Sequence, residues 1–324
     1  MRKINSNQKK EGLIFLGLLL LSIALMIGGG YASAVKRGLL IWVGSVLPSL
    51  FPYAFISACL SKMTVTGKLS NKLTPLTKRF FNTGGVTAYA FTVSLIAGYP
   101  IGSKTVSDLK KGGLISDSES VRASVFCSTS SPMFLLSTVG VIAFNSPKFG
   151  ALLLLSHVIS CFLTGVMFSF YKRKDKPTKN TFNPKKIDNL FYESVFSAIN
   201  SSLFIGGVIV LFTLLIEILL SLKILSLPIF IGEKVLGDYN LSCGLTFGIL
   251  ECTSGIIALK DGGITFLTLP LCGFLCGFGG FCILMQSVCY LKNANIKTAP
   301  FLVAKLFQGG LNFCICLILN LFLF

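Results

Sequence analysis

The chain has 324 residues, of which 53% are hydrophobic and 13% are charged, and its mean hydropathy is +0.79. A soluble domain carries about 25% charged residues, so the composition excludes an ordinary soluble domain and predicts an all-α polytopic membrane protein. The 29 Lys and Arg residues and 12 Asp and Glu residues leave a net charge of +17. The basic residues lie in loops between apolar segments, where cytoplasmic retention and anionic lipid account for them. We therefore expect membrane lipids as partners and no nucleic acid.

Apolar segments that approach the length of a membrane crossing occur at nine places in the chain. They are residues 12–34, 38–60, 84–103, 120–142, 150–171, 196–222, 241–259, 264–290 and 300–324. The first follows four basic residues, and we expect it to be an uncleaved helix whose N-terminus lies in the cytoplasm. The basic loop at 61–83 is expected on the same side.

The basic segment 172–195 indicates that not every apolar segment crosses the membrane. If every apolar segment crossed the membrane in turn, this segment would lie outside, although it carries seven Lys and Arg residues. The conflict disappears if the segment around Gly98–Gly102 enters from the cytoplasm and returns without crossing. A matching segment around Glu251, entering from the outer side, keeps residues 291–299 inside as well. The two halves then enter from opposite sides, which predicts an inverted repeat with re-entrant or broken helices.

Two pairs of interrupted segments have similar spacing in the two halves. Gly255 lies 153 positions after Gly102. The small-residue run 276–283 lies 149 positions after the run 127–134. Small residues let helices approach closely, and broken turns free backbone groups to bind a ligand. Tight packing is the alternative explanation for each single run, whereas the matched pairs favour a polar site between the repeats.

Polar residues in these segments form the candidate substrate site. Glu251 is the only acidic residue of its broken segment, and a carboxylate at membrane depth should face a cavity, as a solute ligand or a Na+ or H+ site. The alternative is a carboxylate at a loop end that reaches water. The predicted substrate-binding residues are Gly98, Tyr99, Pro100, Gly102, Ser128, Thr129, Ser130, Ser131, Glu251, Thr253, Ser254, Gly279 and Gln286.

Other reactive side chains do not point to an enzyme. The 11 cysteines lie almost wholly inside apolar segments without a C-x-x-C pair, so neither disulfides nor metal ligands are predicted. The serines at 128–131 lack a G-x-S-x-G motif, and no catalytic residue is predicted. His157 has no paired acid or cysteine and is interpreted as a packing residue. Lys104 is interpreted as a lysine that reaches the interface, with anion binding as the alternative.

Several of these motifs together resemble a known family. They are residues 47–52 (LPSLFP), 97–104 (AGYPIGSK), 131–134 (SPMF), 251–256 (ECTSGI) and 277–281 (GFGGF), followed by Gln286. The ordered set resembles the YlbJ-type sporulation integral membrane proteins, which carry Gate (nucleoside-recognition) domains. The resemblance covers roughly residues 36–324 and implies a bacterial inner-membrane protein that is needed to build the spore cortex. Gate domains are similar to parts of concentrative nucleoside transporters, which implies broken helices.

The expected organisation has four parts. They are an N-terminal membrane helix at 1–35, a first Gate-like repeat at 36–171, a basic cytoplasmic linker at 172–195 and a second Gate-like repeat at 196–324. The functional hypothesis is a secondary transporter of a small polar solute, with a nucleoside-like molecule as one candidate. A non-transporting membrane scaffold for spore-envelope assembly is the alternative. Neither hypothesis requires a cofactor. Coupling of transport to Na+ or H+ stays open, and so does the formation of a homo-oligomer.

Overall fold

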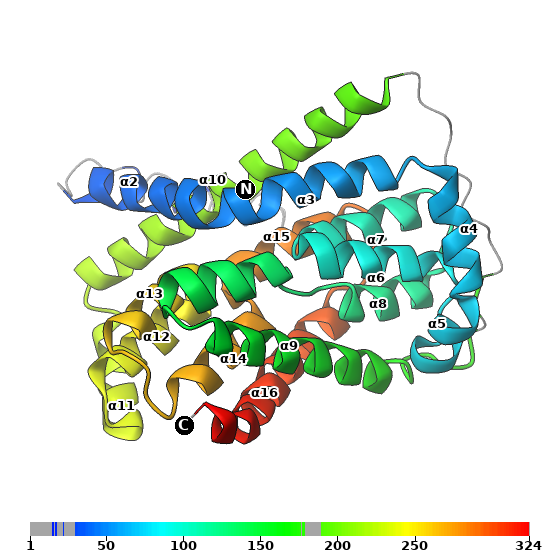
Figure 1. The fold of residues 1–324 in the computed structure, drawn as a ribbon. Coiled ribbons are helices and arrows are strands. Elements are labelled where there is room, and N and C mark those ends of the chain that lie inside the picture. The colour runs from blue at the N-terminus through cyan, green and yellow to red at the C-terminus, as the bar shows by residue number, and fades with distance from the viewer. Residues whose placement is uncertain are drawn as a thin grey trace, which may run out of the picture.

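The computed structural model describes residues 15, 17, 22, 30–175, 177, 178 and 189–323, and every regular element within them is a helix (Figure 1). The first half contains α2 (Tyr31–Ile41), η1 (Trp42–Val46), α3 (Leu47–Leu60), α4 (Thr64–Lys72), α5 (Thr74–Phe81), α6 (Val86–Ala97), α7 (Ile101–Lys111), α8 (Asp117–Phe126), η2 (Phe134–Ala143) and α9 (Pro147–Phe168). The second half contains α10 (Leu190–Ser221), α11 (Ser226–Leu236), α12 (Tyr239–Leu250), α13 (Cys252–Asp261), α14 (Thr268–Phe278), α15 (Gly280–Lys292), α16 (Ala299–Leu319) and η3 (Asn320–Phe322). The all-α fold class is confirmed.

Five stretches in this part of the chain are helical, long and apolar enough to cross a membrane. They are Tyr31–Leu60, Pro147–Phe168, Leu190–Ser221, Thr268–Lys292 and Ala299–Phe322. Each overlaps a predicted apolar segment, and the pair α5–α6, bent by 82°, would make a sixth span. Most of the predicted segment 12–34 lies outside the described residues. The protein is an integral membrane protein with several apolar helices.

The remaining predicted segments are interrupted. Segment 84–103 is divided into α6 and α7, segment 120–142 into α8 and η2, and segment 241–259 into α12 and α13. Glycine permits two of the breaks in the chain, because Gly98 between α6 and α7 has φ +77° and Gly279 between α14 and α15 has φ +91°. Both values lie in the left-handed region that a residue with a Cβ rarely adopts. The prediction of broken helices is therefore confirmed.

Three short helices differ from the expectation. α4 and α5 occupy the predicted loop 61–83, and α11 follows α10 directly. None has more than 11 residues, whereas a crossing needs about 20, so a search for spans could not find them. The helix α10 also begins earlier than expected, at Leu190, where the Asn189 side chain accepts a hydrogen bond from the Tyr192 amide at 3.3 Å.

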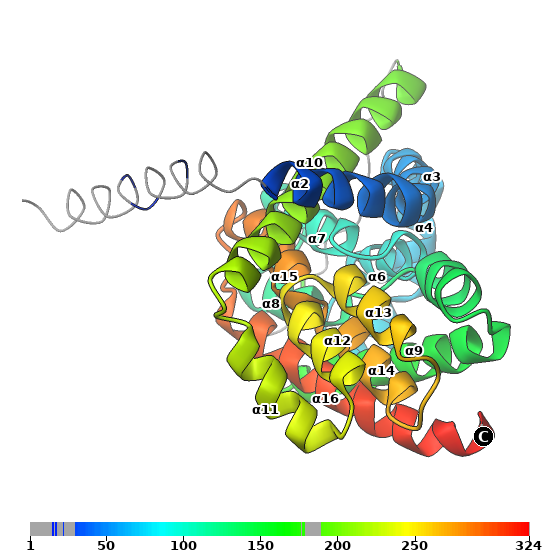
Figure 2. The same ribbon diagram turned by 90° about the vertical axis from the view of Figure 1, so that its left-hand side faces the viewer.

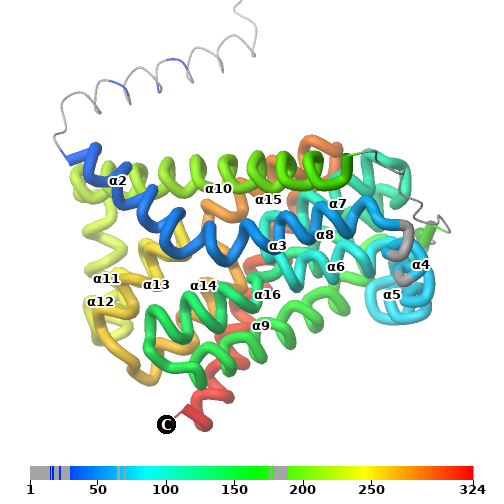
Figure 3. Tube along the Cα trace, turned by 45° about the horizontal axis from the view of Figure 1, so that its top comes forward, coloured from blue at the N-terminus to red at the C-terminus, as the bar shows by residue number. Residues whose placement is uncertain are grey.

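The broken pairs lie towards opposite ends of the molecule. The pair α6–α7 lies on the side of α4 and α5, and the pair α12–α13 lies beside α11 (Figure 1). Helices α2 and α3 run along α10 (Figure 3), while α9, α14 and α16 pack together on the other side (Figure 2). This arrangement agrees with the inverted repeat that the charge distribution predicts.

The two halves share a hydrophobic core. Phe81 of α5 stacks on Phe126 of α8 with ring centroids 4.1 Å apart. The same buried cluster contains Leu291 of α15 and Phe301 of α16. Burial of apolar surface is the main favourable term in folding, so the helices of both halves stabilise one common interior.

Replacement of Gly98 tests how closely the breaks pack. A Cβ at this position would lie 2.7 Å from the backbone nitrogen of Ser131. Gly98→Ala should cost about 1–3 kcal/mol for a backbone conformation that is essentially restricted to glycine, with φ +77° and ψ −174°, and about 1–3 kcal/mol for overpacking. Gly237→Ala is the control for a positive φ without close contacts, because φ is +73° and nothing lies within 4 Å of its Cβ. Thermal unfolding in detergent should show the larger loss for Gly98→Ala, and equal losses would contradict this packing.

Candidate functional site

The breaks of the α6–α7, α8–η2 and α12–α13 pairs meet at one cavity of about 60 Å³. Apolar side chains of α3 and α10 form much of its remaining wall. The predicted site residues that line it are Gly98, Tyr99, Ser130, Ser131, Glu251, Thr253 and Gln286. Residues far apart in the sequence are therefore brought together at this central cavity, and their roles as ligands stay predictions.

The other predicted residues lie around the cavity without lining it. The Thr129 hydroxyl donates to the carbonyl of Ser94 at 2.6 Å, and the Thr129 amide donates to the Ser94 hydroxyl at 3.2 Å. Pro100 and Gly102 lie at the start of α7, and Gly279 forms the α14–α15 break. These residues shape the breaks and hold α6 against the segment that follows α8.

Glu251 closes the N-terminus of α13. Its carboxylate accepts from the Thr253 amide at 3.0 Å, from the Ser254 amide at 2.6 Å and from the Ser254 hydroxyl at 2.7 Å. A helix N-terminus favours a negative charge, because its first amides lack helical partners. The residue is 2% exposed and lines the central cavity, so it is not a loop-end carboxylate that reaches bulk water. The same side chain caps a helix and faces the cavity.

Tyr99 connects three of the broken segments. Its hydroxyl donates to the backbone carbonyl of Cys276 at the end of α14 and accepts from the Ser130 hydroxyl at 2.8 Å. The first half of the chain is thus hydrogen-bonded to the second at the cavity wall. The position is one of those predicted from the sequence, although the pattern alone does not identify its partners.

Lys305 is the principal site residue that sequence reasoning missed. It lies in the first third of α16 and is 0% exposed. It donates to the Ser128 carbonyl at 3.1 Å and to Gln308 Oε1 at 2.9 Å. Its ammonium also lies 4.8 Å from the centroid of the Tyr99 ring, a distance typical of a cation–π contact. A lysine at membrane depth costs about 2.5–3.5 kcal/mol on insertion scales, and that cost is the signal that could have identified it.

His157 is buried within α9, which agrees with its interpretation as a packing residue. It also binds the backbone of the segment between α8 and η2. Its Nε2 accepts from the Ser130 amide at 2.8 Å. Its Nδ1 lies 3.5 Å from the side-chain nitrogen Nδ2 of Asn312. That nitrogen donates to the Gly273 carbonyl at 2.7 Å. The imidazole therefore satisfies a backbone amide that the break leaves outside a helix.

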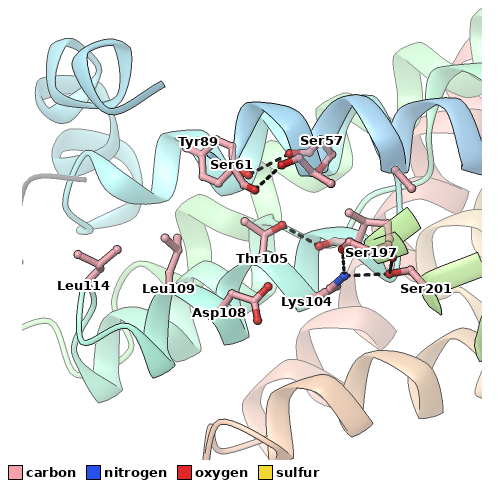
Figure 4. Close-up of a pocket in the computed structure, with 13 residues that line it drawn as sticks. Ser57, Ser61, Tyr89, Lys104, Thr105, Asp108, Leu109, Leu114, Ser197 and Ser201 are labelled. Atoms are coloured by element: carbon pink, nitrogen blue, oxygen red, sulfur yellow. Dashed lines mark hydrogen bonds between the residues drawn. The ribbon is translucent and has the colours of Figure 1, made fainter. Parts of the chain in front are cut away.

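A second, larger cavity of about 220 Å³ lies next to α7. Lys104 donates to the hydroxyls of Ser197 and Ser201, both at 2.9 Å, and Asp108 lines the same space (Figure 4). The Tyr89 hydroxyl lies near the α3 end of this cavity (Figure 4). Lys104 is thus held by α10, which the sequence could not show.

The two cavities follow the same helix faces. On α10, Ser197 and Ser201 line the larger cavity, and Ile205 and Ile209 line the central one. Spacing of four residues places side chains on one face of a helix. On α3, likewise, Leu50 lines the central cavity, while residues 54, 57, 58 and 61 line the larger one. The α3 and α10 faces therefore connect both cavities.

An all-α membrane protein whose broken helices converge on a small cavity that includes polar side chains has a transporter-like fold. Consistent with this class, the fold is similar to the solved structure of CNTnw, a doubly substituted concentrative nucleoside transporter in an outward-facing state. The TM-score is 0.55 with 12% sequence identity, over 98% of this chain and 87% of that one.

Among characterised proteins, the chain is similar to the sporulation integral membrane protein YlbJ of Bacillus subtilis (strain 168). The two are 24% identical over 302 residues, which cover 85% of this chain and 74% of YlbJ. No family model matches the chain. The resemblance to YlbJ-type sporulation membrane proteins is confirmed by this similarity.

Removal of the Tyr99 hydroxyl tests the connection between the halves. Tyr99→Phe leaves the carbonyl of Cys276 and the hydroxyl of Ser130 without this partner, and a buried polar group that loses its partner costs about 1–3 kcal/mol. Tyr192→Phe is the control, because Tyr192 is 58% exposed. We expect a clear fall in the thermal unfolding midpoint for Tyr99→Phe only. An unchanged midpoint would show that the hydroxyl contributes nothing to the interface.

Proposed function

We propose that this protein is a secondary transporter that moves a small polar solute across the inner membrane of a sporulating bacterium. The observation that carries the proposal is the single cavity lined by residues of three helix breaks from both halves. The similarity of the fold to a concentrative nucleoside transporter supports transport rather than catalysis. The similarity to YlbJ supports a role in sporulation, for which the family resemblance suggests spore cortex formation.

The cavity offers hydrogen-bond acceptors to a solute. Gln286 Oε1 is buried and accepts no hydrogen bond from the residues that the structure describes, although the Nε2 of the same amide contacts Cys282 Sγ at 3.4 Å. Glu251 adds a carboxylate, and the hydroxyls of Ser131 and Thr253 can donate or accept. A neutral solute rich in N–H and O–H donors fits this set, and a nucleoside meets the description.

Movement of the halves is needed to admit such a solute. A cavity needs about 10–15 Å³ of probe-occupied volume to hold one water molecule. The central volume of about 60 Å³ therefore has room for only a few water molecules, and a nucleoside-sized molecule requires a wider cavity. We propose that the first Gate-like repeat, at 36–171, and the second, at 196–324, rock about this site and expose it alternately. The N-terminus and the basic linker at 172–195 would lie in the cytoplasm, and a Na+ or H+ gradient would drive the cycle.

The larger cavity beside Lys104 would serve as a vestibule on the solute path. It lies on the same faces of α3 and α10 as the central cavity, and its hydroxyls and charged groups can replace part of the solute's hydration shell. Basic residues of the adjoining loop 61–83 favour the cytoplasmic side for this vestibule.

Complementation of a sporulating host that lacks this chain tests the proposal. A hydrogen bond to a charged group contributes about 1.5–3 kcal/mol, so loss of one between Glu251 and the solute in Glu251→Gln should weaken binding more than about tenfold. We expect few heat-resistant spores from Glu251→Gln at matched membrane abundance. Asp238→Asn is the control, because Asp238 also caps a helix, through the Leu241 amide at 2.8 Å, but does not line the central cavity.

Uptake of labelled nucleosides into proteoliposomes provides the direct measurement. Wild-type protein and Asp238→Asn should accumulate a solute that Glu251→Gln does not. Full rescue of sporulation by Glu251→Gln, together with no uptake by the wild-type protein, would contradict transport through this cavity. That pair of results would favour the non-transporting scaffold for spore-envelope assembly.

A further inference from the structure

The Lys305 ammonium lies where a helix break exposes a backbone carbonyl. In a continuous helix the carbonyl of Ser128 would accept from the amide four residues later, but that residue is Pro132, which has no N–H. Lys305 Nζ lies 3.1 Å from this carbonyl. The sequence of the break therefore creates an acceptor at membrane depth, and a cation from α16 satisfies it.

Every group that holds Nζ acts as an electron donor towards it. Gln308 Oε1 lies at 2.9 Å on the next turn of α16, and the face of the Tyr99 ring lies 4.8 Å away. An ammonium group has three N–H donors and no acceptor, which matches one carbonyl, one amide oxygen and one π-face. Backbone carbonyls and side-chain amide oxygens are also the ligands that proteins offer to hard cations.

No carboxylate of the described residues forms an ion pair with Lys305. Glu251 is engaged by the amides of α13. The ionisable groups that face Lys305 from the packed elements are Tyr99 before α7, His157 and Cys161 of α9, Cys252 of α13 and Cys276 of α14. The charge is therefore held by oxygen dipoles and an aromatic face, in the manner of a bound monovalent ion.

We propose that the Lys305 ammonium is a built-in monovalent cation, which fills the position between the α8–η2 break and α16 that a Na+ or K+ ion would otherwise occupy. This position consequently takes no metal ion from solution. A charge that belongs to the chain cannot leave with a solute, so a Na+ gradient cannot drive transport through this point. The inference concerns the cation position alone and holds whether or not the protein transports a solute.

Removal of the ammonium should turn the position into a site for ions from solution. The thermal unfolding of the purified full-length protein would be followed in NaCl, KCl and ammonium chloride, with choline chloride at the same ionic strength as reference. Wild-type protein should unfold at the same temperature in all four salts. Lys305→Ala should be less stable in choline chloride and regain a few degrees, saturably, with Na+, K+ or ammonium, because a ligand that binds the folded state stabilises it.

Two further variants separate a cation site from a general effect of salt. Lys305→Met fills the space with an apolar chain and should lose stability without recovery in any of these salts. Lys104→Ala removes another hydrogen-bonded lysine, at the larger cavity, and should respond to the salts as the wild-type protein does. A folded Lys305→Ala protein that shows no cation-specific recovery would overturn the proposal.

The wild-type protein and Lys305→Met keep the proposal testable even where Lys305→Ala does not fold. Equal unfolding temperatures in NaCl and choline chloride support the built-in cation. A saturable, Na+-specific rise for wild-type protein that Lys305→Met abolishes would show that this position binds Na+ beside the lysine, and it would overturn the proposal. These readouts require no solute, so they are independent of the uptake and sporulation experiments.

Discussion

Backbone groups at a helix break must find partners inside the protein when the surrounding solvent is lipid, and the centre of this molecule depends on that constraint. The freed carbonyl of Ser128 is bound by Lys305, and the freed amide of Ser130 is bound by His157. The hydroxyl of Tyr99 supplies a donor to the carbonyl at the end of α14. Each partner comes from an element distant in the sequence, so the breaks are stable only in the assembled fold.

The same contacts explain why the two halves form one membrane unit, which the proposed transport cycle requires to rearrange. Hydrogen bonds from side chains to broken backbone connect the halves at the cavity, while a common apolar core lies towards the α5 end. Packed interfaces of this kind tend to have discrete arrangements rather than a continuous range. A central cavity bounded by such contacts, with a separate larger cavity on the same faces of α3 and α10, would suit the proposed cycle between two states.

Much of the candidate site could be predicted from local sequence. Small residues and prolines that interrupt apolar segments identify the breaks, and a lone carboxylate such as Glu251 stands out because charge at membrane depth is costly. Lys305 carries the same signal but was passed over, since one lysine does not interrupt the apolar pattern of α16. The short helices α4, α5 and α11 were also missed, because nothing in a span-length criterion distinguishes them from loops.

The sequence by itself determined that the chain is an all-α membrane protein, that its helices break in matched pairs, and which polar residues lie at the breaks. These properties follow from apolar run length, charge in the loops and the backbone preferences of glycine and proline, all of which act locally. Only the tertiary structure decided that Glu251 caps α13, that Tyr99 reaches α14, and that Lys305 meets the carbonyl of Ser128. Such pairings depend on how helices cross in space, and a one-dimensional pattern does not contain that information.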